Sequence, residues 1–170
     1  MNLPRGVIPQ VPETGQESVW DYPRPPRVEP CAATIRLVLG ELEVATTTTS
    51  FRVLETSHPP NYYLPRSCFA EGVLVPAGGR TTVCEFKGVA HYFDVVAPDG
   101  TRRPRAGWSY PDPRPGYEPI AGAVAVYPSA FDLVTVDGEQ VRAQGGGFYG
   151  GWITAVVVGP FKGAPGSSGW

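Results

Sequence analysis

Short apolar stretches with partial period-two alternation recur through the middle of the chain. They are rich in Val, Ile, Thr and aromatic residues, and read ATIRLVLG, LEVATTTTSFRVLE, RTTVCEFKG, VAHYFDVV and AGAVAVY. Such alternation is typical of β-strands with one buried face, and Gly, Pro and Asp-Gly signals separate the stretches. Asp99-Gly100 and Asp137-Gly138 predict tight hairpin turns. The pattern therefore predicts an all-β core, with a helical turn only at PRSCFAEGVL.

Proline and glycine divide the chain into three parts. Residues 1–30 hold so many prolines, and so little apolar periodicity, that they predict an extended arm anchored by Trp20 and Tyr22. Residues 31–133 form the predicted β-core, and residues 134–170 form a hairpin followed by an extension rich in Gly and aromatics. This extension cannot form a core by itself, so it either packs against the β-core or stays mobile.

Composition narrows the class of protein. A chain of 170 residues with 42% hydrophobic residues is long enough for one core and too short for two ordinary domains. Its formal net charge of −2 argues against nucleic acid or an anionic membrane as a partner. No charged leader precedes an apolar segment, and no apolar run approaches the roughly 18 residues of a spanning helix. We therefore expect a soluble, cytoplasmic protein.

Cysteine and histidine are too sparse and too scattered to signal a bound metal. The chain has three widely spaced cysteines and two histidines, without a paired Cys-x-x-Cys. Neither a disulfide framework nor a structural zinc site fits this spacing. We therefore expect reduced thiols, no metal and no cofactor.

One rigid polar segment, LETSHPPNYYLPRS, lies between predicted strands. His58 precedes two prolines that hold the chain extended, Glu55 lies three residues earlier, and two tyrosines follow at positions 62 and 63. The segment is therefore a candidate wall of a binding site. Alternatively, the histidine caps a turn and the tyrosines pack half-buried with hydrated hydroxyls.

Two other stretches carry candidate chemistry. In a regular strand, Cys84 and Lys87 would point to opposite faces unless Gly88 marks a bulge that re-aims the lysine. Cys84 is then a core residue or a reactive thiol, and Lys87 a solvated cation or a residue at the mouth of a site. The stiff loop GWSYPDPRPGYEPIAG, with Trp108 and Tyr110, suits stacking on a ligand or covering a sheet edge.

Four motifs, in this order and spacing, resemble the domain-of-unknown-function family numbered 427, a small all-β family. They are LETSHPPNYYLPR, RTTVCEFKGVAHYF, GWSYPDP and IAGAVAVYP, and GGFYGGWIT and GPFKG resemble the C-terminal extension of one subgroup. The resemblance implies a tent-like, Mss4-like antiparallel sheet without zinc. The family also carries a nucleotidyltransferase label, for which this sequence offers no paired carboxylates at metal-binding spacing and no phosphate loop.

Carried onto this chain, the family motifs imply one site on the face of the sheet. The implied catalytic residues are His58, Glu55, Lys87 and Cys84, and the implied ligand-binding residues are Tyr63, Trp108, Tyr110 and Tyr127. In this hypothesis Lys87 meets an anionic group, the aromatics stack on the ligand, and His58 with Glu55 transfers a proton. Cys84 or Lys87 is then an optional nucleophile.

Two further functions fit the same sequence. A non-catalytic module that binds a small polar, anionic or aromatic metabolite would use the same residues without a proton-transfer pair. An interaction protein would instead present YPRPPRVEP to a partner and clasp a second subunit with its extension, as a homodimer. The sequence leaves open whether the protein is an enzyme, with acid–base or transfer chemistry, including nucleotidyl transfer.

Overall fold

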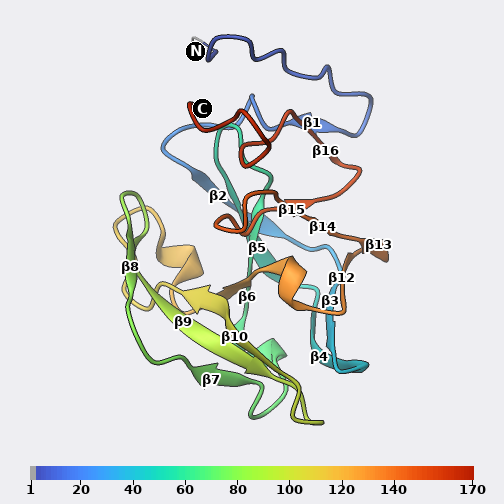
Figure 1. The fold of residues 1–170 in the computed structure, drawn as a ribbon, viewed down its shortest axis with the longest axis vertical. Coiled ribbons are helices and arrows are strands. Elements are labelled where there is room, and N and C mark those ends of the chain that lie inside the picture. Colours follow the sequence, from blue (N-terminus) through green and yellow to red (C-terminus); the bar gives the residue numbers. More distant parts are fainter. Residues whose placement is uncertain (1–2) are drawn as a thin grey trace.

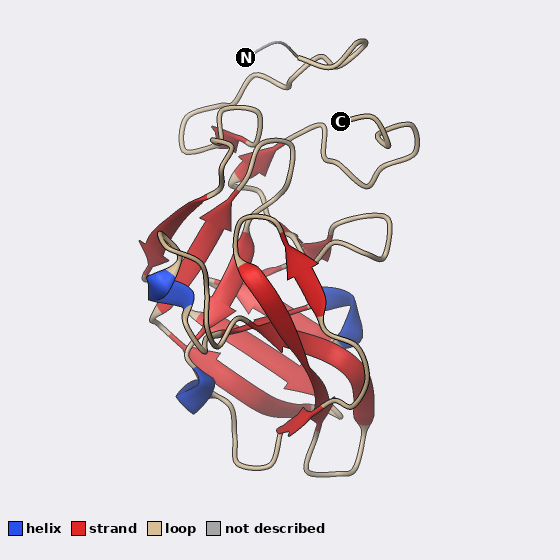
Figure 2. Ribbon diagram, turned by 90° about the vertical axis from the view of Figure 1, so that its left-hand side faces the viewer, coloured by secondary structure: helices blue, strands red, loops and turns tan. Residues whose placement is uncertain are grey.

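The computed structural model describes residues 3–170, so the first two residues of the predicted arm lie outside the described residues. Within 3–170 the chain forms β-strands and three 3-10 turns but no α-helix, which confirms the all-β prediction (Figure 1, Figure 2). The 3-10 turns are η1 (Arg66–Cys68), η2 (Glu118–Ile120) and η3 (Pro128–Ala130). The first of them is the predicted helical turn. None of the helices in this range is long and apolar enough to cross a membrane.

The main sheet is antiparallel and joins eight strands of the described chain. Its order is β2 (Arg27–Cys31), β5 (Ser50–Leu54), β6 (Asn61–Leu64), β11 (Val124–Val126), β10 (Arg102–Ser109), β9 (Gly88–Val96) and β7 (Leu74–Pro76), and β8 (Thr82–Cys84) also pairs with β9. Pro30 lies in the edge strand β2, where a missing N–H breaks no inner ladder. The proline-rich arm thus ends in an edge strand.

A second antiparallel sheet of four strands in the described chain covers the core. Its order is β13 (Glu139–Gln140), β12 (Leu133–Val136), β3 (Ile35–Leu39) and β4 (Leu42–Thr47). In β3, Ile35, Leu37 and Leu39 are fully buried and alternate with more exposed residues, as period-two patterning predicts. Their side chains pack with residues of β6, β9 and β11, so the main core is shared by the two sheets.

Both predicted hairpin turns are present. Asp137 and Gly138 join β12 to β13 with φ values of 49° and 82°. Positive φ at both central residues is the geometry that favours Asp-Gly in two-residue turns. Between β9 and β10, only Gly100 of the Asp99-Gly100 pair has a positive φ, at 89°.

The arm and the extension meet at one end of the molecule (Figure 1). There β1 (Glu17–Ser18) pairs in parallel with β16 (Val157–Val158). Trp20 and Tyr22, the predicted anchors of the arm, are buried beside this pair. The indole N–H of Trp20 donates to the carbonyl of Pro160 at 2.9 Å. The two segments therefore hold each other in place.

The extension also reaches the main core through Trp152. It contains β14 (Arg142–Ala143) and β15 (Trp152–Ile153), which pair with each other. The Trp152 side chain is 1% exposed, stacks on Tyr62 with 4.7 Å between ring centroids, and donates from Nε1 to the Val126 carbonyl at 3.2 Å. Of the two outcomes open for the extension, packing against the β-core is the observed one.

Replacing Trp152 tests how much this contact stabilises the fold. We expect Trp152→Ala to lower the free energy of unfolding by about 3–5 kcal/mol, because it empties a fully buried aromatic site. Urea denaturation followed by circular dichroism measures the change. Phe148→Ala is the matched control, since its side chain lies in the same extension but is 73% exposed. Equal effects of the two substitutions would mean that the extension contributes little to the core.

Candidate functional site

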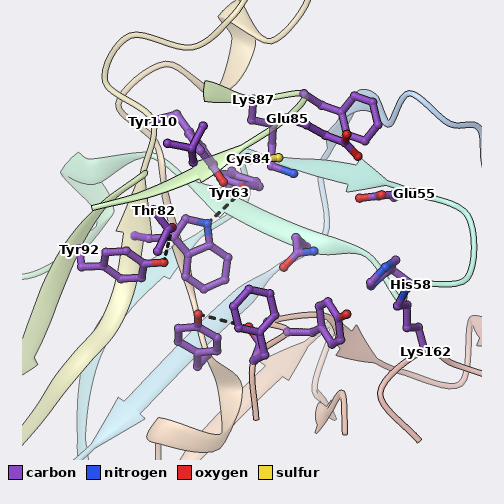
Figure 3. Close-up of a pocket in the computed structure, with 18 of the residues that line it drawn as sticks. Glu55, His58, Tyr63, Thr82, Cys84, Glu85, Lys87, Tyr92, Tyr110 and Lys162 are labelled. Atoms are coloured by element: carbon purple, nitrogen blue, oxygen red, sulfur yellow. Dashed lines mark hydrogen bonds between the residues drawn. The ribbon is translucent and has the colours of Figure 1, made fainter. Parts of the chain in front are cut away.

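A cavity of about 340 Å³ lies where the main sheet meets the arm and the extension (Figure 3). All eight residues selected from the sequence line it: Glu55, His58, Tyr63, Cys84, Lys87, Trp108, Tyr110 and Tyr127. Sequence reasoning missed Arg24 of the arm, Asn61 of β6, and Tyr149 and Lys162 of the extension, which also line it. The structure thus brings the selected side chains together, and their individual roles remain predictions.

The stretch that carries Cys84 and Lys87 is a hairpin turn rather than a continuous strand. Strand β8 ends at Cys84, which pairs with Gly88 at the start of β9. Gly88 has a φ of 103°, so the chain turns between the two and strand alternation no longer applies. Cys84 and Lys87 therefore both face the cavity (Figure 3). Of the two alternatives that the sequence offered, Gly88 redirects the lysine, through a turn rather than a bulge.

Lys87 is a buried cation without a carboxylate partner. Its side chain is 8% exposed, and its Nζ lies 5.8 Å from the ring centroid of Tyr110. In residues 3–170, no carboxylate oxygen lies within 4.0 Å of this Nζ. A buried charge normally has a partner, so the aromatic face alone leaves the ammonium group under-compensated.

The two carboxylates at the cavity are held by the arm. Arg24 lies 3.5 Å from the carboxylate of Glu55 and 3.0 Å from that of Glu85, with its guanidinium over the ring of Phe86. Sequence reasoning placed Glu55 beside the imidazole of His58, but the carboxylate pairs with Arg24. No local pattern in the proline-rich arm could have signalled this contact, because it joins residues 31 positions apart.

His58 is buried and bonded on one side of its ring. Its side chain is 8% exposed, its Nδ1 lies 3.0 Å from Nε2 of Gln144, and Tyr149 packs edge-on at 4.8 Å between centroids. Burial, followed by the positive charges of Lys162, Arg24 and Lys87, lowers the pKa of His58 to about 4. The imidazole is therefore neutral at physiological pH.

Aromatic side chains form a further wall of the cavity. Trp108 donates from Nε1 to the hydroxyl oxygen of Tyr63 at 3.3 Å, and its ring lies 4.7 Å from that of Tyr127. Burial raises the pKa of Tyr63 and of Tyr110, so both phenols stay protonated. Cys84 packs half-buried against this aromatic cluster. The cavity thus offers flat faces together with neutral hydroxyls.

Gly150 lets the extension close against this wall. A Cβ atom at position 150 would lie 2.2 Å from Cη2 of Trp108, which is far inside van der Waals contact. The extension can therefore reach the cavity only with a residue that lacks a side chain at this point.

The described residues contain no group of three or more His, Cys, Asp or Glu side chains placed to hold a metal ion. The groups at the cavity include the buried ammonium group of Lys87, a neutral imidazole, a thiol and several aromatic rings, together with Lys162 and the Arg24-bound carboxylates. These groups can bind an anion and stack on a planar molecule.

Comparisons with known proteins cover the central part of the chain. A family model described as a domain of unknown function (DUF427), and labelled NTP_transf_9, matches residues 27–137. A search of curated proteins finds no match. The matched range contains all eight selected residues but not Arg24, Gln144, Tyr149 or Lys162. The arm and the extension therefore complete a cavity whose other walls lie in the matched domain.

The low pKa of His58 predicts a loss of stability in acid. An unfolded chain takes up the histidine proton near its ordinary pKa of about 6.5, whereas the folded chain does so only near 4. This contribution is therefore complete above about pH 6.5 and is lost as the pH falls to 4, by on the order of 3 kcal/mol. Urea denaturation at several pH values measures it.

The two histidines of the chain supply the variants for this measurement. His58→Gln should flatten the dependence of the unfolding free energy on pH between 6.5 and 4. His91→Gln should leave it unchanged, because His91 is exposed. An identical slope in wild type and His58→Gln would contradict the assignment of a buried neutral imidazole.

Gly150→Ala should disturb the cavity by overpacking. We expect a loss of about 1–3 kcal/mol in the free energy of unfolding, because the added methyl group collides with the indole of Trp108. Gly78→Ala is the matched control, since a Cβ at position 78 meets nothing within 4 Å. Thermal unfolding of both variants measures the difference, and equal melting temperatures would refute the close approach.

Proposed function

Because the chain belongs to the DUF427 family, whose description assigns no activity, we propose a function from the cavity: the protein binds a small planar metabolite that carries an anionic group. The observation that carries this proposal is Lys87, buried at the cavity with no carboxylate among the described residues within 4.0 Å. An anionic group of a ligand supplies the missing partner through a charge-assisted hydrogen bond.

The balance of charge around the cavity supports an anionic ligand. Arg24, Lys87 and Lys162 line it, against the carboxylates of Glu55 and Glu85. Both carboxylates lie at Arg24, so the positive charge of Lys87 is not neutralised by them. Opposite charges attract more strongly in a site with little water, which makes Lys87 the natural anchor for the ligand.

The walls support a planar ligand. The rings of Trp108, Tyr110 and Tyr127 offer faces and edges for stacking. A volume of about 340 Å³ is within the usual range for small-molecule pockets. Asn61 also lines the cavity, and its Oδ1 is sealed from solvent without a hydrogen-bond partner among the described residues. The support for a planar ligand therefore comes from the aromatic walls and the volume of the cavity.

Binding is favoured over proton transfer and over partner recruitment. The carboxylate of Glu55 lies at Arg24 and the imidazole of His58 at Gln144, so the hypothesised proton-transfer pair of these two residues is not formed. The segment YPRPPRVEP contacts its own chain, through Arg24 and through β2. Nucleotides have a planar base and phosphates, so they belong to the proposed ligand class as well.

Two properties of the whole protein are proposed on the family resemblance and on composition. The main sheet is of the tent type, which superposition of an experimental structure on Mss4-like proteins would test. The protein works in the cytoplasm on a small-molecule partner.

A thermal-shift screen tests the proposal. The panel contains aromatic carboxylates, nucleoside mono- and triphosphates, sugar phosphates, and uncharged analogues of each. A planar anion at a hundred times its dissociation constant should stabilise the wild type by about 2.7 kcal/mol, and its uncharged analogue should not. Stabilisation by nucleotides alone would direct the next assays to nucleotidyl transfer.

Lys87→Met should weaken binding of any active compound by about tenfold or more, since it removes the charge and keeps the length of the side chain. Arg36→Met is the matched control, because its side chain is exposed in the second sheet and pairs with Glu43. Equal binding by Lys87→Met and wild type would overturn the proposal, as would a panel in which no anion stabilises the protein.

A further inference from the structure

The amide of Gln144 has an orientation that the main chain dictates. Gln144 is buried, its Oε1 accepts the N–H of Gly151 at 3.1 Å, and its Nε2 donates to the carbonyl of Lys162 at 2.8 Å. Exchanging the two atoms would set an N–H against an N–H and an oxygen against an oxygen. The main-chain groups on both sides therefore decide which atom is the nitrogen.

This orientation determines where His58 carries its proton. The second N–H of the Gln144 amide points at Nδ1 of His58, 3.0 Å away. Because a donor already occupies that direction, Nδ1 must accept, and the single proton of a neutral imidazole is on Nε2. The two peptide groups that orient the amide of Gln144 thereby also determine the tautomer of His58.

The Nε2–H group of His58 remains available for a hydrogen bond at the cavity. It has no hydrogen-bond partner in residues 3–170, and it is not among the polar atoms sealed from solvent without a partner. His58 itself lines the cavity (Figure 3). A polar N–H directed into a ligand pocket is a recognition group.

Burial, and then the charges around the ring, keep the imidazole neutral. Lys162 on the extension, Arg24 on the arm and Lys87 on the hairpin turn all act on His58 with positive charge. The carboxylate of Glu55 is held by Arg24, and Tyr149 presents only its ring. A second proton on the imidazole would face these cations without a carboxylate to bind it.

We propose that Gln144 holds His58 as the Nε2–H tautomer, so that His58 donates a hydrogen bond to an acceptor atom of the bound planar anion. Gln144 is then a positioning residue and His58 a specificity-determining residue. The ligand that fits has a carbonyl oxygen or an unprotonated ring nitrogen in addition to its anionic group. The tautomer stands on the structure alone, whereas the role in recognition rests on the proposed function.

Nitrogen-15 NMR of the full chain tests the tautomer without any ligand. With two histidines in the sequence, exposed His91 serves as an internal reference. At pH 7 the wild type should show an unprotonated Nδ1 and a protonated Nε2 for His58. Gln144→Leu removes the amide, and His58 should then show a mixture of tautomers. A protonated Nδ1 of His58 in the wild type would overturn the proposal.

A pair of matched probes tests the role in recognition. Benzoate and the pyridine carboxylates are planar anions of the same size, and only the pyridine carboxylates have a ring acceptor. The wild type should bind the best pyridine carboxylate about three- to tenfold more tightly than benzoate, as one hydrogen bond allows. His58→Phe should remove this preference and still bind benzoate.

The outcomes separate the two proposals. A preference that survives in His58→Phe, or no preference in the wild type, overturns the role of His58 and leaves the proposed function standing. Lys87→Met should weaken both probes together. Failure of the wild type to bind either probe contradicts both the donor role and the proposed function for aromatic carboxylates, while the NMR measurement still decides the tautomer.

Discussion

The burial of Trp152 is the contact on which the cavity depends. This one side chain carries the extension into the main core, where it stacks on Tyr62 and bonds to the carbonyl of Val126. Trp152 follows directly after Gly150 and Gly151, so its position brings their backbone against Trp108 and Gln144. Stability and cavity geometry are therefore coupled, because the burial of Trp152 both fills the core and brings the extension against the wall of the cavity.

Charge inside the cavity is distributed unevenly, and main-chain groups take part in the distribution. Arg24 pairs with both carboxylates, which leaves Lys87 without one. The amide of Gln144 is oriented by two peptide groups and in turn orients His58. The cavity therefore combines a buried ammonium group with an imidazole, and different parts of the chain determine the states of the two groups. How well such a site would recognise a ligand depends on how rigidly the surrounding residues hold these two groups.

The sequence predicted those features of the fold that neighbouring residues determine, namely strand alternation and tight turns. Alternation along β3 follows from a sheet with one buried face, and the Asp137-Gly138 turn follows from positive φ at both residues. Strand alternation does not apply to the Cys84–Lys87 stretch, because Gly88 turns the chain although the apolar residues around it suggest a continuous strand. Sequence motifs were enough to gather eight residues around one cavity.

Three residues at or behind the cavity had no signal in the strand pattern: Arg24, Gln144 and Lys162. Arg24 and Lys162 reach the cavity, and Gln144 reaches His58, only through long-range packing. Single charged or amide residues in Pro- or Gly-rich segments carry no periodicity. Contacts of this kind depend on the summed burial of distant side chains such as Trp20 and Trp152. These contacts therefore become visible only in the folded structure.

The parallel pairing of β1 with β16 has a consequence for how the protein is made. Glu17 pairs with Val157, so the arm has no partner strand until residue 157 has left the ribosome. Closing a loop of that length is slow compared with forming the hairpins of the two sheets. A nascent chain will therefore form the hairpins of the two sheets before the arm and the extension can meet at the cavity. The cavity is complete only once the extension has left the ribosome and brought Tyr149 and Lys162 to its wall.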